Sequence, residues 1–297
     1  MVRNRIARAG LLLTFFVFAA GISGGRVFAQ TTFYFPQIAD GGAFTTTIFI
    51  TNPGQPSTTA NVTITLNGSN GTPMSTVTFV DNLGGSQTGT ISLTLAGGRS
   101  RRLVSTASSG TTLTGFATVT SDIPVTGSAV FSQFNGAPQS GSLVGEAGVT
   151  GSSALTGQAI FVDETNPFTT ALAYANPSQT SIANVNFNLL DTNGVQVQST
   201  ATVLLPMRHG ALFVNQLFTA SPVTNHVGTM QIVSDNPVAT VSLRFAGSLF
   251  TSVPPFSLAS LVSPVVTPLG QWLGSRTLPA PLAAFAKALT AFRSSAG

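Results

Sequence analysis

The sequence lacks cysteine altogether and contains few of the side chains on which catalytic and metal sites depend. The absence of cysteine among 297 residues excludes disulfide bonds, thiolate nucleophiles and thiolate metal ligands. It also excludes membrane anchoring through a lipid-modified cysteine. Only two histidines, His209 and His226, are present, and no cluster with the spacing of a zinc site surrounds them. Without disulfides, each domain must be held together by its own hydrophobic core.

Charged residues are scarce as well, at 7% of the chain, whereas hydrophobic residues make up 43%. So much apolar surface can form a buried core, which argues against disorder. The formal net charge of +4 arises at the two ends, because residues 30–260 contain five basic and eight acidic residues. We therefore expect no nucleic-acid partner, since nucleic-acid binding needs a basic surface.

The first 29 residues have the pattern of a cleaved signal peptide. Arginines precede the apolar run 11–20, and Val27 and Ala29 occupy positions −3 and −1 before Gln30. A retained membrane anchor is the alternative, but the run is shorter than the roughly 20 apolar residues of a spanning helix. We expect cleavage before Gln30, no transmembrane helix in the mature chain, and a secreted or cell-surface location.

The sequence that follows repeats itself. Four segments recur in the same order, namely Phe44–Pro53 with Phe168–Pro177, Ala60–Val62 with Ala183–Val185, Ser69–Gly71 with Thr192–Gly194, and Ser121–Val125 with Ser234–Val238. Self-similarity at such a spacing indicates duplication of a structural unit. We place the two copies at residues 31–149 and 157–260.

Short runs of alternating apolar and polar residues predict β-strands in both copies. The clearest runs are Asn61–Leu66, Val77–Phe79, Ile91–Leu95, Val185–Leu189, Met230–Val233 and Val241–Leu243. The dipeptides Asn70-Gly71 and Asn193-Gly194 predict hairpin turns in which both residues have positive φ. About seven short strands per copy, without helical periodicity, favour two tandem immunoglobulin-like antiparallel β-sandwich domains.

Two segments of the first copy resemble a known arrangement. Residues 35–44 read Phe-Pro-Gln-Ile-Ala-Asp-Gly-Gly-Ala-Phe and are followed by a Thr-rich run that ends at Asn52-Pro53, while residues 145–149 read Gly-Glu-Ala-Gly-Val. This pattern resembles paired β-sandwich repeats of secreted bacterial proteins of unknown function. The second copy departs from the opening motif at residues 161–168. The resemblance implies the architecture and brings no activity with it.

The C-terminal residues 261–297 have a different character. Residues 264–281 are rich in proline and predict a linker, and Leu282, Phe285, Leu289 and Phe292 fall on one helical face. We expect a short amphipathic helix that packs weakly, with docking to a partner or a membrane surface as the alternative.

The titratable residues form no recognisable site. His209, in a predicted turn, and His226, before a predicted strand, are expected to be exposed loop residues. Asp163-Glu164, aligned with Asp40, is interpreted as a turn or solubilising pair, with a calcium site as the alternative. Asp122 and Asp235 are expected to cap their own turns. We therefore predict no catalytic, cofactor-binding or metal-binding residue.

These observations favour a non-enzymatic role. The chain is expected to be an exported structural or interaction protein of the bacterial cell surface or exterior, whose partner would be an extracellular protein or polysaccharide. A carbohydrate- or matrix-binding adhesin module is the alternative, although one Trp and two Tyr supply few of the rings that favour interfaces. A hydrolase is a further alternative, since abundant serine never excludes a Ser-His-Asp site by counting alone.

Overall fold

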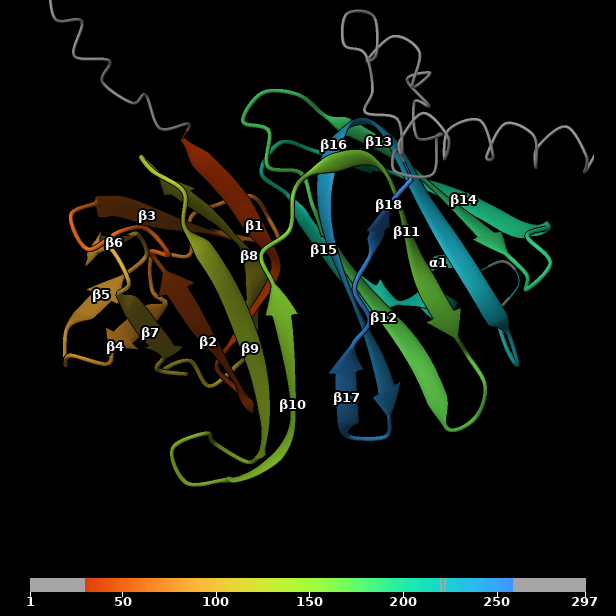
Figure 1. Cartoon of the computed structure of the whole chain (residues 1–297). Coiled ribbons are helices and arrows are strands. Elements are labelled where there is room, and N and C mark those ends of the chain that lie inside the picture. The colour runs from red at the N-terminus through yellow and green to blue at the C-terminus, as the bar shows by residue number, and fades with distance from the viewer. Residues whose placement is uncertain (1–29, 220, 222, 259–297) are drawn as a thin grey trace, which may run out of the picture.

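The computed structural model of the chain describes residues 30–219, 221 and 223–258, and this part is almost entirely β-structure (Figure 1). Its strands form two lobes, which we call the first lobe (residues 31–150) and the second lobe (residues 155–257). Within the described residues the sole helix is α1 (Val214–Leu217), and no helix there has the length and apolarity that crossing a membrane requires. The predicted all-β fold is confirmed.

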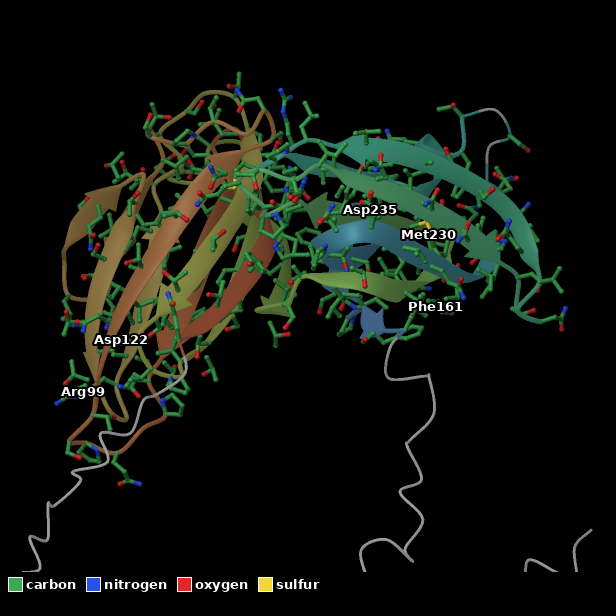
Figure 2. All side chains as sticks on the ribbon, turned by 90° about the horizontal axis from the view of Figure 1, so that it is seen from above. Arg99, Asp122, Phe161, Met230 and Asp235 are labelled. Atoms are coloured by element: carbon green, nitrogen blue, oxygen red, sulfur yellow. The ribbon has the colours of Figure 1, made fainter. Side chains whose placement is uncertain are left out.

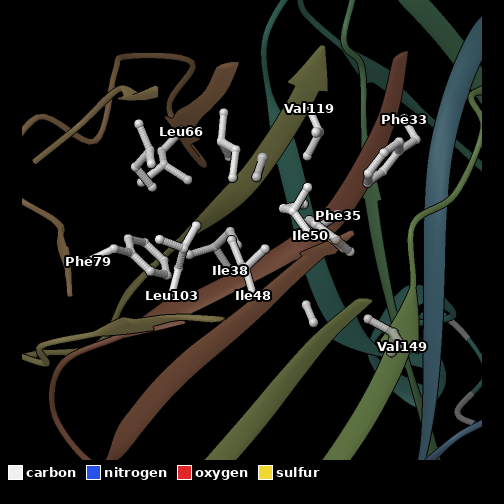
Figure 3. Packing of buried hydrophobic residues seen from close by; sticks show 14 of the residues in the cluster. Phe33, Phe35, Ile38, Ile48, Ile50, Leu66, Phe79, Leu103, Val119 and Val149 are labelled. Atoms are coloured by element: carbon white, nitrogen blue, oxygen red, sulfur yellow. The ribbon is translucent and has the colours of Figure 1, made fainter. Parts of the chain in front are cut away.

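Ten strands make up the first lobe. They are β1 (Thr31–Asp40), β2 (Phe44–Thr51), β3 (Thr59–Gly68), β4 (Thr78–Asp81), β5 (Ser86–Thr88), β6 (Ile91–Ala96), β7 (Ser100–Ser105), β8 (Leu113–Ser121), β9 (Thr126–Asn135) and β10 (Ser142–Thr150). They form a four-stranded sheet in the order β1-β8-β3-β6 and a six-stranded sheet in the order β10-β9-β2-β7-β4-β5. Both sheets contribute to one hydrophobic core, in which Phe35, Ile48 and Phe79 are almost completely buried (Figure 3).

Eight strands make up the second lobe. They are β11 (Leu155–Asp163), β12 (Phe168–Ala175), β13 (Ala183–Leu190), β14 (Gln196–Leu204), β15 (His209–Phe213), β16 (Val227–Ala246), β17 (Leu249–Ser252) and β18 (Phe256–Ser257). The 20-residue strand β16 belongs to two ladders: its first part pairs with β11 and β13, and its second part pairs with β12 and β17. In the first lobe two separate strands make the equivalent pairings: β8 pairs with β1 and β3, and β9 pairs with β2 and β10.

The strand pairings follow the same order in both lobes. In the first lobe β3 lies between β6 and β8, and β8 lies beside β1. In the second lobe β13 lies between β14 and β16, and β16 lies beside β11. Likewise β2 pairs with β7 and β9, as β12 pairs with β15 and β16. The β4–β5 hairpin extends the first lobe only.

The strands form because alternating apolar side chains reach one core face. Strand β6 alternates strictly between buried and exposed residues, and the first five residues of β13 do the same from Ala183. Five of the six predicted runs lie within strands, namely β3, β6, β13 and both parts of β16, and the run Val77–Phe79 begins one residue before β4. The two Asn-Gly turns differ from the prediction: Gly71 and Gly194 have positive φ, whereas neither asparagine is among the residues with positive φ.

Asparagine and aspartate side chains make the same hydrogen bonds in both lobes. Asn52 Nδ2 donates to Leu95 O (2.9 Å), and Asn176 Nδ2 donates to Leu204 O (3.0 Å). Because Leu95 lies in β6 and Leu204 in β14, each completely buried asparagine connects the strand before it, β2 or β12, to a strand with which that strand does not pair. The equivalent hydrogen bonds explain why asparagine occurs at both positions.

The turn aspartates do more than the predicted capping. Asp122 accepts hydrogen bonds from Asn61 N (2.8 Å) and Asn61 Nδ2 (2.7 Å), and Asp235 accepts the same pair from Asn184 at 2.8 and 2.6 Å. These donors hold the pKa of both carboxyls below the usual range. Figure 2 labels Asp122 in the first lobe and Asp235 in the second. Each therefore ties its turn to a neighbouring strand, β3 or β13, and also interacts with backbone N–H groups of its own turn.

Some predictions lie outside the described residues. These are the signal peptide at residues 1–29, the last residues of the second predicted copy at 259–260, and the linker and helix at 261–297. The boundaries 31–149 and 157–260 remain predictions.

Replacing Asn176 with alanine is expected to lower the free energy of unfolding by about 1–3 kcal/mol, because the buried carbonyl oxygen of Leu204 and the carbonyl oxygen of Ser181 lose their shared donor. Urea unfolding measures the effect. The matched control, Asn186→Ala, changes an exposed asparagine of β13 and should shift the value by no more than about 0.5 kcal/mol. Equal effects of the two substitutions would contradict this role of Asn176.

Candidate functional site

The seam between the two lobes contains the most unusual polar residue of the chain. His209, expected to be exposed, is instead the first residue of β15 and is only 5% exposed. Its Nε2 lies 2.8 Å from Gln37 Oε1, and its Nδ1 lies 3.0 Å from Ser69 Oγ. Both partners belong to the first lobe. The exposed-loop prediction was wrong because the second lobe places this histidine against another part of the chain.

The hydrogen bonds of His209 define its chemical state. A carboxamide oxygen only accepts, so Nε2 carries the proton and Nδ1 accepts from the Ser69 hydroxyl. Burial disfavours the imidazolium and lowers the pKa of His209 to about 4, although the backbone carbonyl of Pro36 acts in the opposite direction. At neutral pH the ring is therefore uncharged and joins the lobes.

Local irregularities bring the partners of His209 into position. The β1–β8 register shifts between Phe35 and Ile38, and Pro36, which has no N–H, lies within the shift. Gln37 therefore projects from a β-bulge. Ser69 begins the Asn-Gly turn, whose Gly71 packs so closely on the second lobe that an added Cβ would lie 3.3 Å from Pro206 O.

Further contacts extend the seam on both sides of His209. Tyr34 of the first lobe and Ser152, in the segment that connects the lobes, exchange backbone hydrogen bonds of 2.9 and 2.8 Å. Strand β10 lies beside β17 (Figure 1), where an added Cβ on Gly145 would lie 2.8 Å from Ser248 O. The hydrophobic core of the first lobe includes Ala173, Val241 and Phe250 of the second. The seam is therefore a packed interface.

An apolar groove opens along the seam, with a cavity volume of about 290 Å³. We call it the aromatic groove, after its phenylalanine residues Phe44, Phe131, Phe213, Phe245 and Phe250. The Phe213 and Phe250 rings lie 5.3 and 5.1 Å from the Phe245 ring. Gln37 and Gln216 supply polar groups, and none of the described lining residues is charged. The groove therefore suits an uncharged, largely apolar group.

The acidic pair Asp163-Glu164 is structural. Both residues are 7% exposed. Asp163 Oδ2 accepts from Arg244 Nε (2.8 Å) and forms an ion pair with Arg244 Nη2 (2.7 Å), while the Arg244 guanidinium lies 3.3 Å from the Phe168 ring centroid. Glu164 instead accepts from Thr170 N and Thr169 Oγ1, both at 2.8 Å. The solubilising role was therefore wrong, because both side chains are buried and bonded within the lobe.

The pKa values of the two carboxyls move in opposite directions. Burial opposes ionisation of Asp163, but hydrogen bonds from Thr165 and Arg244 outweigh it and lower the pKa. Burial raises the pKa of Glu164, and the neighbouring Asp163 charge acts in the same direction. All four carboxylate oxygens accept hydrogen bonds from protein donors, so the calcium alternative gains no support from this geometry.

The remaining candidates do not come together. His226 precedes β16 as predicted but is half-buried, and its backbone oxygen accepts from Glu164 N at 2.8 Å. The first-lobe counterpart Asp40 is completely buried and accepts from Ala107 N at 2.9 Å. Among the residues that the structure describes, no three His, Asp or Glu side chains are grouped closely enough to hold a metal ion.

Acidification tests the buried state of His209. Because its pKa is lowered from 6.5 to about 4, the unfolded chain takes up a proton before the folded chain does. The free energy of unfolding at pH 7 should therefore include about 3 kcal/mol from this difference in pKa. That part is lost as the pH falls from about 6.5 towards 4. Urea unfolding of the unmodified chain at several pH values measures this loss.

Two substitutions separate His209 from the other titrating groups. His209→Gln should be less stable at pH 7 and should lack this part of the pH dependence, whereas His226→Gln should retain it. If His209→Gln loses as much stability on acidification as the unmodified chain, His209 is not the group that titrates.

Comparisons with known proteins do not place the chain in a family. No family model, curated protein or solved structure matches it. The resemblance to secreted bacterial repeats therefore stays a prediction, and the function has to be inferred from the residues of the chain itself.

Proposed function

We propose that the chain is an exported, non-catalytic structural or interaction protein of the bacterial cell surface or exterior, built from two tandem immunoglobulin-like β-sandwich domains. The observation that carries the proposal is the use of its titratable residues as structural connections. His209 joins the lobes, Asp163 pairs with Arg244, and Asp122 and Asp235 bind neighbouring strands. An enzyme would need such groups to face a substrate.

The duplicated architecture supports the same proposal. The pairing order recurs in both lobes, and so do the hydrogen bonds of Asn52 and Asn176. A core enclosed by two sheets in the first lobe, and by the two ladders that share β16 in the second, supports a sandwich arrangement. Rigid β-units in series suit a spacer or an interaction module, because they hold surfaces at a fixed separation.

Export is tested by expressing the whole coding sequence in a bacterium and determining the N-terminus of the exported form. The exported chain should begin at Gln30, because Val27 and Ala29 supply residues acceptable to the processing enzyme. Ala29→Asp should block cleavage and leave the longer form. Thr32→Asp, placed beyond the cleavage site, is the control. Recovery of an uncleaved chain from the cytoplasm alone would contradict export.

The adhesin alternative has one specific observation in its favour, the aromatic groove. Apolar rings flanked by Gln37 and Gln216 offer stacking faces and hydrogen bonds to an uncharged polysaccharide. Glycan-array binding that is lost in Phe213→Ala and kept in Phe161→Ala, which changes an exposed phenylalanine outside the groove, would favour the adhesin. Absence of binding at high micromolar concentration would count against it.

A further inference from the structure

Positive charge is concentrated at one place between the two ends of the chain. Residues 30–260 contain five basic residues, all of them arginine, and three of these lie within four positions, at Arg99, Arg101 and Arg102. We call these three residues the arginine cluster. The same part of the chain contains eight acidic residues, so the arginine cluster differs in sign from the net charge around it.

The arginine cluster lies where the β6–β7 hairpin turns back into its sheet. Arg99 follows the turn, and Arg101 and Arg102 belong to β7. Arg99 and Arg102 are exposed, whereas Arg101 is half-buried. Figure 2 shows Arg99 at the end of the first lobe, on the side away from the second lobe. No described lining residue of the aromatic groove belongs to the cluster, so the cluster is a separate surface.

Hydrogen bonds and close packing fix the backbone that carries the cluster. Arg99 N donates to Ala96 O, and Arg99 O accepts from Asn52 N, both at 3.0 Å. Gly97, in the same turn, packs so closely against the Gln55 carbonyl that an added Cβ would overlap it. A backbone that is already ordered loses less conformational freedom when a ligand binds.

The second lobe forms the same hairpin connection without the cluster. Arg208 O accepts a hydrogen bond of 2.9 Å from Asn176 N, which makes Arg208 the counterpart of Arg99. The positions of the other two arginines hold Gly210 and Ala211 in the second lobe. The strand pairing therefore does not require the arginine side chains, and a purely structural role does not account for them.

The charges of the arginine cluster are largely uncompensated. Within the described residues, none of its three side chains forms an ion pair. Backbone N–H groups of its own turn, led by that of Gly85, lower the pKa of Asp81, and the charge of Arg101 adds to this effect. Asp81 thus offsets part of the charge at Arg101. The guanidinium groups of Arg99 and Arg102 remain available, and each offers a planar set of donors that matches a carboxylate.

An exposed aromatic ring adjoins the arginine cluster. Phe49 of β2 is 37% exposed and lies directly opposite Arg102 in the β2–β7 pair. Residues directly opposite in an antiparallel pair share one face of the sheet, so this ring and this guanidinium project from the same face. The second-lobe counterpart of Phe49 is Ala173, which is buried against the first lobe. An apolar ring beside a cation suits a ligand that has both apolar surface and negative charge.

These features favour an acidic polysaccharide over other anions. The carboxylates of such a polymer match the guanidinium groups, and the C–H faces of its sugar rings match the Phe49 ring. From Arg99 to Arg102 the extended backbone advances about 10 Å, which is comparable to the length of a disaccharide. A phosphate polymer would use the charges of the cluster but would leave the Phe49 ring without a partner.

We propose that the arginine cluster and Phe49 form a binding surface for a carboxylate-bearing polysaccharide outside the cell. Arg99 and Arg102 donate hydrogen bonds to carboxylates of the polymer, Phe49 packs on a sugar ring, and Arg101 adds positive charge. The inference rests on the proposed function, because it names the class of partner of an exported interaction protein. The N-terminus of the exported form tests export and binding to the purified chain tests this surface, so each can fail without the other.

Binding is measured by isothermal titration calorimetry on the chain purified after expression of the whole coding sequence. The probe is oligogalacturonate, which has a carboxylate on every sugar. The unmodified chain should bind it, and added salt should weaken the binding, because salt screens exposed charges. Arg99→Gln with Arg102→Gln should weaken binding roughly tenfold or more, because two charge-assisted hydrogen-bonding groups are lost.

Matched variants separate this surface from net charge. Arg208→Glu, at the exposed counterpart of Arg99, changes the net charge by as much as the double glutamine substitution does, and should bind like the unmodified chain. Phe49→Ala should weaken binding to oligogalacturonate roughly threefold or more and should leave binding to inorganic polyphosphate unchanged. Circular dichroism verifies that every variant is folded.

Four results would overturn the proposal. The first is no binding by the unmodified chain at about 1 mM oligogalacturonate. The second is equal weakening by Arg208→Glu and by the double glutamine substitution. The third is equally tight binding of the fully methyl-esterified oligomer, which has no charge. The fourth is equal affinity for polyphosphate without any effect of Phe49→Ala, which would identify an unselective basic surface. If the exported chain begins at Gln30, each of these results leaves the proposed function in place.

Discussion

The arrangement of the two lobes depends on one buried, uncharged histidine. His209 of the second lobe has both ring nitrogens satisfied by Gln37 and Ser69 of the first. A polar ring removed from water is costly unless its hydrogen bonds are made, so separating the lobes must expose it or leave it unsatisfied. Apolar contacts that include Val241 and Phe250 accompany this connection. The lobes are therefore energetically coupled, although each has its own sheets.

Within each lobe, a small set of polar side chains holds the sheets in register. Thr46 Oγ1 bonds both backbone groups of Ala39, and Thr170 Oγ1 bonds those of Asp163. Together with the buried asparagines of the Asn-Pro turns, these groups satisfy backbone atoms that strand pairing leaves open. A chain without disulfides and with few charges thus combines two apolar cores with uncharged hydrogen bonds at equivalent positions.

The sequence allowed the strands to be predicted because alternation is local: one face of β6 or β13 is buried whatever lies beyond it. The sequence repeat identified Asn52 and Asn176 as equivalent positions, but it did not predict the hydrogen bonds that their side chains make. Burial of His209 could not be predicted, because its partners lie 140 and 172 residues away in the sequence. The same applies to Asp163, whose partner Arg244 follows 81 residues later. Local patterns predict elements, whereas the packing of the lobes determines which polar residues are buried.

The coupling of the lobes is the central claim, and differential scanning calorimetry at neutral pH tests it most directly. The account predicts one transition whose calorimetric and van't Hoff enthalpies agree, because loss of either lobe exposes the seam of the other. Two resolved transitions, or a calorimetric enthalpy about twice the van't Hoff value, would show that the lobes unfold independently and would contradict the coupling through His209.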